Sequence, residues 1–272
     1  MQWSRVKSIL IVLLLLVDGF LGCMLGVKAF SAYQQAQTTR AQLDTVLAGY
    51  GLTLDETMSL PDEALMPQLN IDRNRADEAA VATALLGGEA ERSEEEAGSR
   101  FTSPVGTVVW SEDGTLEAVL QPAGYVRPTA DEVRAQAAAL LQDAGIQTAG
   151  ADWETHVWTA RAHFKTAGYA VFNRALTVTF SEEAVRIEGL WTFDTPYATR
   201  SDLYATYNPV DALLQFARQG LASQVVDMEP GLLLGNTAGN QFQLSPVWKI
   251  TADTGVYYAD PIKNEITAAE EE

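Results

Sequence analysis

Residues 105–120 read VGTVVWSEDGTLEAVL, and this stretch predicts a β-hairpin. Two short apolar runs, 105–109 and 116–120, lie on either side of the sequence SEDG at 111–114. These four residue types favour a tight turn between antiparallel strands. A helical pattern follows the hairpin, so the order of elements predicts an α+β fold.

The helical pattern lies at residues 130–144, where apolar side chains recur about every 3.6 residues. Thr129 is the expected N-cap and Gly145 the expected stop. A second helix is predicted at 209–221, with Asn208 as its cap and a proline at its first position.

Strand patterns surround both helices. They lie at 156–164, 169–172, 176–180, 184–193, 225–234, 241–250 and 255–259. The recurrence of hairpin, helix and further strands predicts two related α+β units in series, 51–150 and 151–262, with antiparallel sheets and packed helices. An acidic C-terminal tail, 263–272, follows them.

Three segments precede the hairpin. Residues 51–70 hold two prolines and predict an extended connector, and residues 77–86 predict a short amphipathic helix ended by two glycines. Residues 89–100 (EAERSEEEAGSR) are charged and poor in apolar side chains, so we expect a solvent-exposed acidic loop.

The N-terminus predicts a membrane anchor. Residues 9–27 read ILIVLLLLVDGFLGCMLGV, a helix of roughly 28 Å that can cross the hydrocarbon core. Arg5 and Lys7 precede it, so we expect a cytoplasmic tail at 1–8 and a transmembrane helix at 9–28. A juxtamembrane helix at 29–50 and an extracytoplasmic remainder complete a single-pass topology in the cell membrane.

Two cleaved forms remain as alternatives to the retained anchor. Ala29 and Ala32 offer small residues for a secretory cleavage site. The pair Gly22-Cys23 offers a lipoprotein cleavage site, with Cys23 as the acylated residue. A mature chain that begins at Cys23 and carries lipid would establish this second alternative.

Asp18, Gly19, Gly22 and Gly26 predict a helix–helix contact face within the span. Gly19, Gly22 and Gly26 are three and four residues apart, so they lie on one side of a helix and let a partner helix approach closely. Asp18 borders this face and can hydrogen-bond a polar group of the partner.

The composition excludes several classes of function. The chain of 272 residues has 36 acidic and 18 basic side chains and a formal charge of −18, which disfavours binding to nucleic acid. Its one cysteine permits no intramolecular disulfide and no thiolate metal cluster.

We find no nucleophile elbow, zinc-protease helix, phosphate loop or calcium-binding loop in the sequence. His156 and His163 are seven residues apart, which places them on opposite faces of a strand and argues against shared metal ligation. The sequence therefore predicts no cofactor, no metal and no catalytic site.

Several short segments of the sequence resemble the YycI (WalI) family, whose members are membrane-anchored accessory proteins of the YycG/WalK sensor histidine kinase. The segment most specific to the family is MQWSRVKSI at residues 1–9, directly before the predicted span. Others are ALLG at 84–87, residues 101–110, VFN at 171–173, LSPVWKI at 244–250 and GVYY at 255–258. Asp18 and the acidic segment 89–100 depart from the family pattern.

The resemblance implies a non-enzymatic regulator that contacts the kinase and a sister protein of the YycH type, partly through the transmembrane helix. It also implies an α+β extracytoplasmic part. Two alternatives stay open: an anchored PepSY-like extracytoplasmic binding or inhibitory module unrelated to the kinase, and an anchored hydrolase that acts through two carboxylates.

Overall fold

The computed structural model of the chain describes residues 24, 40–95, 98–192, 195–198, 204–238 and 240–269. It confirms the α+β class: most strands pair antiparallel, and helices pack on the sheets. Within these ranges no helix has the length and hydropathy that a membrane crossing needs. The tail predicted at 1–8 and the span predicted at 9–28, Met24 apart, lie outside the described residues.

One supersecondary unit occurs three times in the described part of the chain: a helix of 11 residues followed by four antiparallel strands. We call each occurrence a module. The first module consists of α2 (Arg75–Leu85), β4 (Glu91–Glu95), β5 (Gly98–Ser103), β6 (Gly106–Ser111) and β7 (Thr115–Leu120). The second consists of α3 (Val133–Asp143), β8 (Asp152–His156), β9 (Thr159–Thr166), β10 (Tyr169–Phe180) and β11 (Val185–Leu190). The third consists of α4 (Pro209–Gln219), β13 (Gln224–Ala238), β14 (Gln241–Ala252), β15 (Gly255–Asp260) and β16 (Glu265–Ala268).

The meander of each module follows from its short turns. In all three modules, two residues separate the first strand from the second and the second from the third. Ala167 and Gly168 form one of these turns with φ of 52° and 85°, which matches the right-handed twist of the flanking strands. Turns this short force neighbouring strands to pair antiparallel.

The helices begin and end where local chemistry places them. Asn208 accepts a hydrogen bond from the N–H of Val210 (2.9 Å), Pro209 occupies the first position, and Gly220 ends α4 in a left-handed conformation. These features confirm the prediction for this helix. The helix predicted from residue 130 begins three residues later, after a turn in which the N–H of Glu132 donates to the carbonyl of Thr129 (2.9 Å). The carboxylate of Glu132 accepts hydrogen bonds from the N–H and hydroxyl of Thr129.

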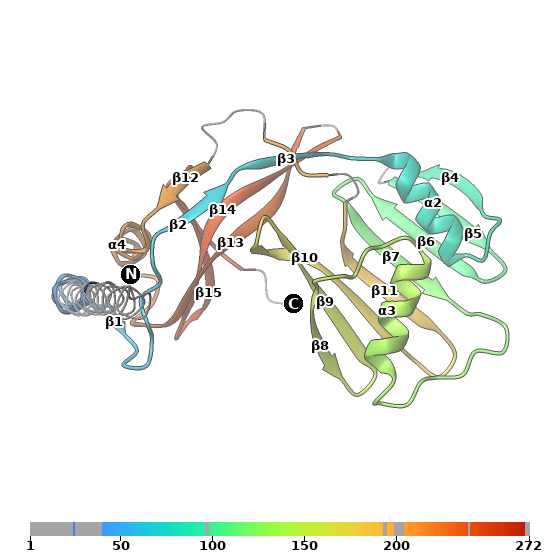
Figure 1. Cartoon of the computed structure of the whole chain (residues 1–272), viewed down its shortest axis with the longest axis horizontal. Coiled ribbons are helices and arrows are strands. Elements are labelled where there is room, and N and C mark those ends of the chain that lie inside the picture. Colours follow the sequence, from blue (N-terminus) through green and yellow to red (C-terminus); the bar gives the residue numbers. More distant parts are fainter. Residues whose placement is uncertain are drawn as a thin grey trace, which may run out of the picture.

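The first two modules form eight neighbouring strands, which we call the large sheet and which continue through the β10–β13 pairing into the strands of the third module. Their fourth strands, β7 and β11, pair antiparallel, so the strand order is β8-β9-β10-β11-β7-β6-β5-β4. Both α2 and α3 pack on the same face of this sheet (Figure 1) and close one hydrophobic core with it. Trp110, Leu116, Leu141, Leu176 and Ile187 are among its fully buried side chains.

The third module carries the N-terminal segment on its sheet and forms the other limb of an arch (Figure 1). Residues 40–48 are helical, and β1 (Thr53–Leu54), β2 (Ala64–Pro67), β3 (Leu69–Asp72) and β12 (Tyr204–Tyr207) follow. Here β1 pairs with β13, β3 with β14, and β2 with β12. Its core includes Leu47, Met66, Phe216 and Trp248.

The predicted units 51–150 and 151–262 are wrong in their boundary. The buried apolar side chains of 160–187, apart from Val171 and Ala175, complete the core that α2 begins, whereas those of 43–66 join the core of the third module. Leu69, Ile71 and Val171 form a smaller cluster with side chains of β13 and β14. Buried apolar side chains group by strand pairing and not by position in the chain, so the two cores interleave along the sequence.

The acidic segment 89–100 is also not the predicted loop. Residues 91–95 form β4 and residues 98–103 form β5, although every side chain of β4 is exposed. A charged strand is typical of a sheet edge, where it prevents pairing with other chains. In the predicted acidic tail 263–272, residues 265–268 form β16, which pairs with β15 and places Ile266 against the core.

A buried ion pair connects β3 to the first module. Arg73 and Glu78 are both almost fully buried, and the Arg73 guanidinium donates to Glu78 and to the carbonyls of Ser111 (2.7 Å) and Glu112 (2.6 Å). The pair therefore fixes the start of α2 to the turn between β6 and β7. Removing one partner would leave a buried charge without compensation.

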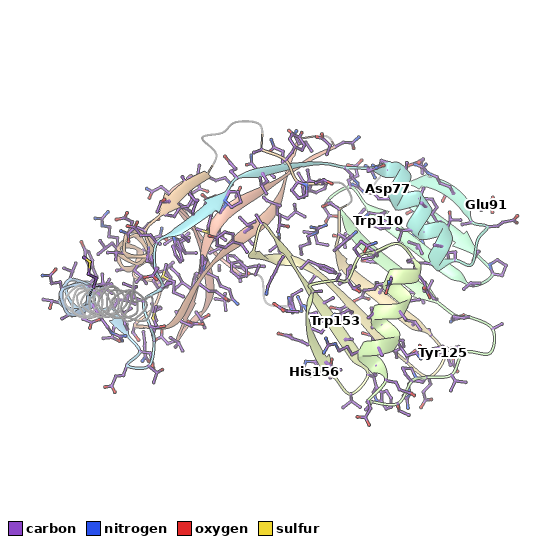
Figure 2. All side chains as sticks on the ribbon, in the orientation of Figure 1. Asp77, Glu91, Trp110, Tyr125, Trp153 and His156 are labelled. Atoms are coloured by element: carbon purple, nitrogen blue, oxygen red, sulfur yellow. The ribbon has the colours of Figure 1, made fainter. Side chains whose placement is uncertain are left out.

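We expect Glu78→Gln to lower the free energy of unfolding by about 3 kcal/mol, because the Arg73 charge would remain buried. The matched control is Asp77→Asn, an exposed neighbour on the same helix (Figure 2), for which we expect a loss below about 1 kcal/mol. Urea unfolding of residues 30–272 measures both. Equal losses for the two variants would contradict a structural role of the pair.

Candidate functional site

The large sheet has one face that no described helix covers, and we call it the open face. Along each strand, open-face residues alternate with core residues, and the strand register aligns them in rows across the sheet. One row crosses eight strands and consists of Glu154, Arg161, Thr177, Glu188, Glu117, Val109, Arg100 and Ser93.

The open face is polar, with charges of both signs. Lys165 on β9 lies 2.7 Å from Asp152 on the neighbouring strand β8, and Arg186 lies 2.9 Å from Glu188 on the same strand, β11. Glu117 stands directly opposite Glu188, and like charges in register are unfavourable. The Arg186 guanidinium offsets this repulsion. Such a surface is suited to hydrogen bonds and ion pairs with a ligand.

A cleft of about 590 Å³ lies at the margin of the open face, where the large sheet meets the third module. We call it the junction cleft. Strands β9, β10 and β11, the turn before β7, and β13 all contribute side chains to its wall. These residues are Asp113, Thr115, Arg161, Asn173, Ala175, Thr177, Glu188, Gly189, Leu190 and Leu234.

The junction cleft exists because β10 takes part in both sheets. Its first residues pair in parallel with β13 (Ala170 with Gly231), and its later residues pair with β9 and β11. Between these two pairings the register with β9 shifts between Ala170 and Ala175, where four residues of β10 stand against one of β9, a bulge-like irregularity. A bulge bends a strand and increases its twist. Strand β10 therefore leaves one sheet and enters the other.

Asn173 extends the pairing at this bend. Its side-chain Nδ2 donates to the carbonyl of Leu234 (2.7 Å), and its Oδ1 accepts from the N–H of Leu234 (2.8 Å). The amide thus replaces a backbone peptide group in the sheet. These two bonds satisfy backbone groups of β13 that β10 no longer reaches.

Phe172 lies over β13 at a glycine. A Cβ on Gly231 would come within 2.4 Å of the Phe172 ring and 2.9 Å of the carbonyl oxygen of Ala170. On its other side, Phe172 stacks against Tyr258 with ring centroids 5.6 Å apart, and the Lys249 ammonium lies 5.2 Å from the ring centroid. The close crossing of β10 and β13 therefore requires glycine at position 231.

Arg174 anchors the bend from the other side. Its guanidinium donates to the carbonyl of Thr192 (2.9 Å) and lies 4.2 Å from the centroid of the Trp191 ring. Burial lowers the pKa of Arg174 to about 10, so the side chain stays charged at neutral pH. A buried cation at this point fixes the segment after β11 against β10.

A second, smaller cleft of about 200 Å³ adjoins the first and shares Asn173 and Leu234 with it. The remaining wall comes from β13 to β16 and from the turn between β15 and β16, and it includes Tyr258, Lys263 and Glu265. The two clefts adjoin at Asn173, and charged side chains of both signs line each of them; we call the two clefts together the groove.

The chemistry of this region indicates binding. In the described ranges no three histidine, cysteine or acidic side chains gather in a geometry for a metal ion. His156 ends β8 (Figure 2) and His163 lies on β9, where its Nε2 is 3.5 Å from Glu154. The groove offers amide, hydroxyl, carboxylate and guanidinium groups, which recognise polar segments of a polypeptide.

The four residues predicted as the partner face, Asp18, Gly19, Gly22 and Gly26, lie outside the described residues. Asn173, at the bend of β10, lines both clefts, and it is part of no catalytic or metal-binding motif in the sequence. In the sequence, the one feature that could point to Asn173 is the segment VFN at 171–173, in which a polar amide interrupts an apolar strand.

We expect Gly231→Ala to lower the free energy of unfolding by about 1–3 kcal/mol, because the added methyl overlaps the Phe172 ring. Gly235→Ala, in the same strand but with open space at its Cβ position, should change stability by less than about 1 kcal/mol. Chemical unfolding of residues 30–272 compares them. An equal effect of both would contradict the close crossing at position 231.

We expect Asn173→Asp to destabilise the protein by about 1–3 kcal/mol at neutral pH, because a carboxylate oxygen would face the carbonyl of Leu234. This repulsion raises the pKa of the introduced carboxyl above its unfolded value of about 3.9, since only the protonated form can donate. The deficit relative to the wild type should therefore be small below about pH 4 and grow as the pH rises. Unfolding at several pH values measures it, and a deficit independent of pH would contradict the two-bond pairing.

No family model matches the sequence, and no curated protein matches it. Among solved structures, the chain is similar to an uncharacterized protein from Eubacterium rectale ATCC 33656, with a TM-score of 0.40 and 9% identity over 81% of this chain and 86% of that one. It is also similar to the Bacillus megaterium YpeB C-terminal domain, with a TM-score of 0.29 and 14% identity over 74% of this chain and 100% of that one. Both TM-scores are below 0.5, so the functional proposal below rests on the residues of this chain.

Proposed function

We propose that the chain is a non-catalytic binding module whose junction cleft and open face together receive a polypeptide partner. The observation that carries this proposal is the continuity of the two surfaces. Arg161, Thr177 and Glu188 belong both to the eight-strand row of the open face and to the wall of the junction cleft. A partner segment in the cleft would therefore also contact the open face.

The groove favours an extended polar segment with charges of both signs. Its wall presents the carboxylates of Asp113 and Glu188 beside the guanidinium of Arg161 and the hydroxyls of two threonines. Charged and polar groups in such an arrangement provide specificity and orientation more than affinity. Regulated, reversible contact is the behaviour we expect from this surface.

The N-terminal sequence supports the cellular setting of the proposal. Residues 9–28 would anchor the chain as a single-pass protein of the cell membrane, with residues 29–272 outside the cytoplasm. The resemblance of residues 1–9 to the YycI family supports a sensor histidine kinase of the YycG/WalK type as partner, with a YycH-type accessory protein beside it. The chain would then regulate a cell-wall-responsive two-component system.

The second candidate is an anchored PepSY-like binding or inhibitory module with a partner other than the kinase. The observation that favours it is that described residues of the folded part, between 113 and 190 and between 233 and 267, line both clefts of the groove. In this case the membrane segment would only hold the module at the surface.

Exchange of the span separates the two candidates. With a kinase partner contacted through the membrane helix, Gly22→Ile and Gly26→Ile should weaken co-purification of the full-length protein with the kinase and the sister protein. Asp18→Leu should weaken it less, because measured interhelical hydrogen bonds average only about 0.6 kcal/mol. Unchanged capture of the kinase by a chain with a foreign leucine-rich span would contradict recognition through the span.

A substitution in the groove tests the binding surface itself. Thr177→Tyr places a ring in the junction cleft and should reduce partner capture, whereas Thr107→Tyr, on the same face but outside the cleft, should not. Circular dichroism melting of both variants controls for folding. Equal capture by both variants would contradict a role of the cleft in binding.

A further inference from the structure

The three modules differ in what covers their fourth strand. In the first two, the fourth strands β7 and β11 pair with each other, and this pairing joins two four-stranded meanders into one sheet. In the third, the fourth strand is β16, and among the described residues it pairs with β15 alone. In the described part of the chain, the edge that is covered in two modules therefore has no partner strand in the third.

The outer edge of β16 presents backbone groups for pairing. The N–H of Ala269 donates to the carbonyl of Val256 (2.8 Å), which fixes the alternation along the strand. In an antiparallel pair, every second residue directs its N–H and C=O to the neighbouring strand. Ile266 and Ala268 therefore direct these groups away from β15, toward the open edge.

The side chains of β16 do not protect this edge. The two edge strands of the sheet formed by the first two modules are charged: β4 reads ERSEE and β8 reads DWETH. Charges on edge strands prevent pairing with other chains. Strand β16 reads EITA and has one charge, at its first residue, so its edge lacks the protection that β4 and β8 have.

We infer that β16 pairs antiparallel with β16 of a second copy of this chain. The pairing would repeat the β7–β11 joint across a two-fold axis and produce an eight-stranded sheet from two third modules. As with α2 and α3, both α4 helices would lie on one face of that sheet. The smaller clefts, which Glu265 and Thr267 line, would lie on the other face.

Opposing carboxylates are compatible with a joint of this kind. Glu117 and Glu188 face each other in the β7–β11 pair. Either residue 267 or residue 268 would lie at the two-fold axis, directly opposite its own copy in the partner.

Site-specific cross-linking of the full-length protein in membranes tests the dimer. Cys23→Ser removes the one native thiol, and single cysteines are then introduced as Thr267→Cys or Ala268→Cys. One of these should give an oxidised homodimer at about ten times the yield of Thr155→Cys, because directly opposite residues meet the short Cβ–Cβ distance of a disulfide. Thr155 is exposed on the edge strand β8, so it reports collisions caused by association of the spans alone.

A second pair of variants tests the backbone pairing. In the chain with the cross-linking cysteine at 267, Ala268→Pro removes an outward N–H and should lower the dimer yield about tenfold, whereas Ala268→Val keeps the N–H and should not. Three results would overturn the inference: yields at both positions no higher than at Thr155, equal yields for the two variants at 268, or a cross-link from β16 to a different protein.

Discussion

The Asn173 amide, bonded through both of its polar atoms to the backbone of Leu234, is the contact on which the arrangement of the modules depends. It lies where β10 leaves the sheet of the third module and enters the sheet of the first two. Without it, two backbone groups of β13 would lack partners at a partly buried position, which is costly. With it, the strand can bend while the sheet stays hydrogen-bonded. The junction cleft is the space beside this bend.

The repeated module explains why so much of the chain serves one surface. A helix covers one face of each four-stranded meander, so the opposite face is left for other contacts. Joining two modules through β7 and β11 doubles the width of that face. Attaching the third module through β10 and β13 closes one side of it into a cleft. The proposed pairing of β16 would extend the same construction from one chain to two.

The elements of the fold could be predicted from the sequence, but not their grouping. Turn residues at 111–114 and the Asn208-Pro209 cap act locally, and both predictions were confirmed. The parallel pairing of Ala170 with Gly231 joins distant residues, and no local pattern indicates it. Charged residues 91–95 suggested a loop because an edge strand exposes all its side chains. Within the candidate site, Asn173 was missed because its role depends on where β13 passes, while Asp18 and the span glycines stay a prediction.

Hydrogen–deuterium exchange of the junction tests the account most directly. If the Asn173 bend makes one cooperative body of the two cores, amides in 170–176 and 231–235 should exchange only as fast as those in the buried strands of either core, such as 160–164 and 247–250. Exchange of the junction segments well ahead of both cores would show that the two limbs move independently. The cleft would then not be a preformed surface.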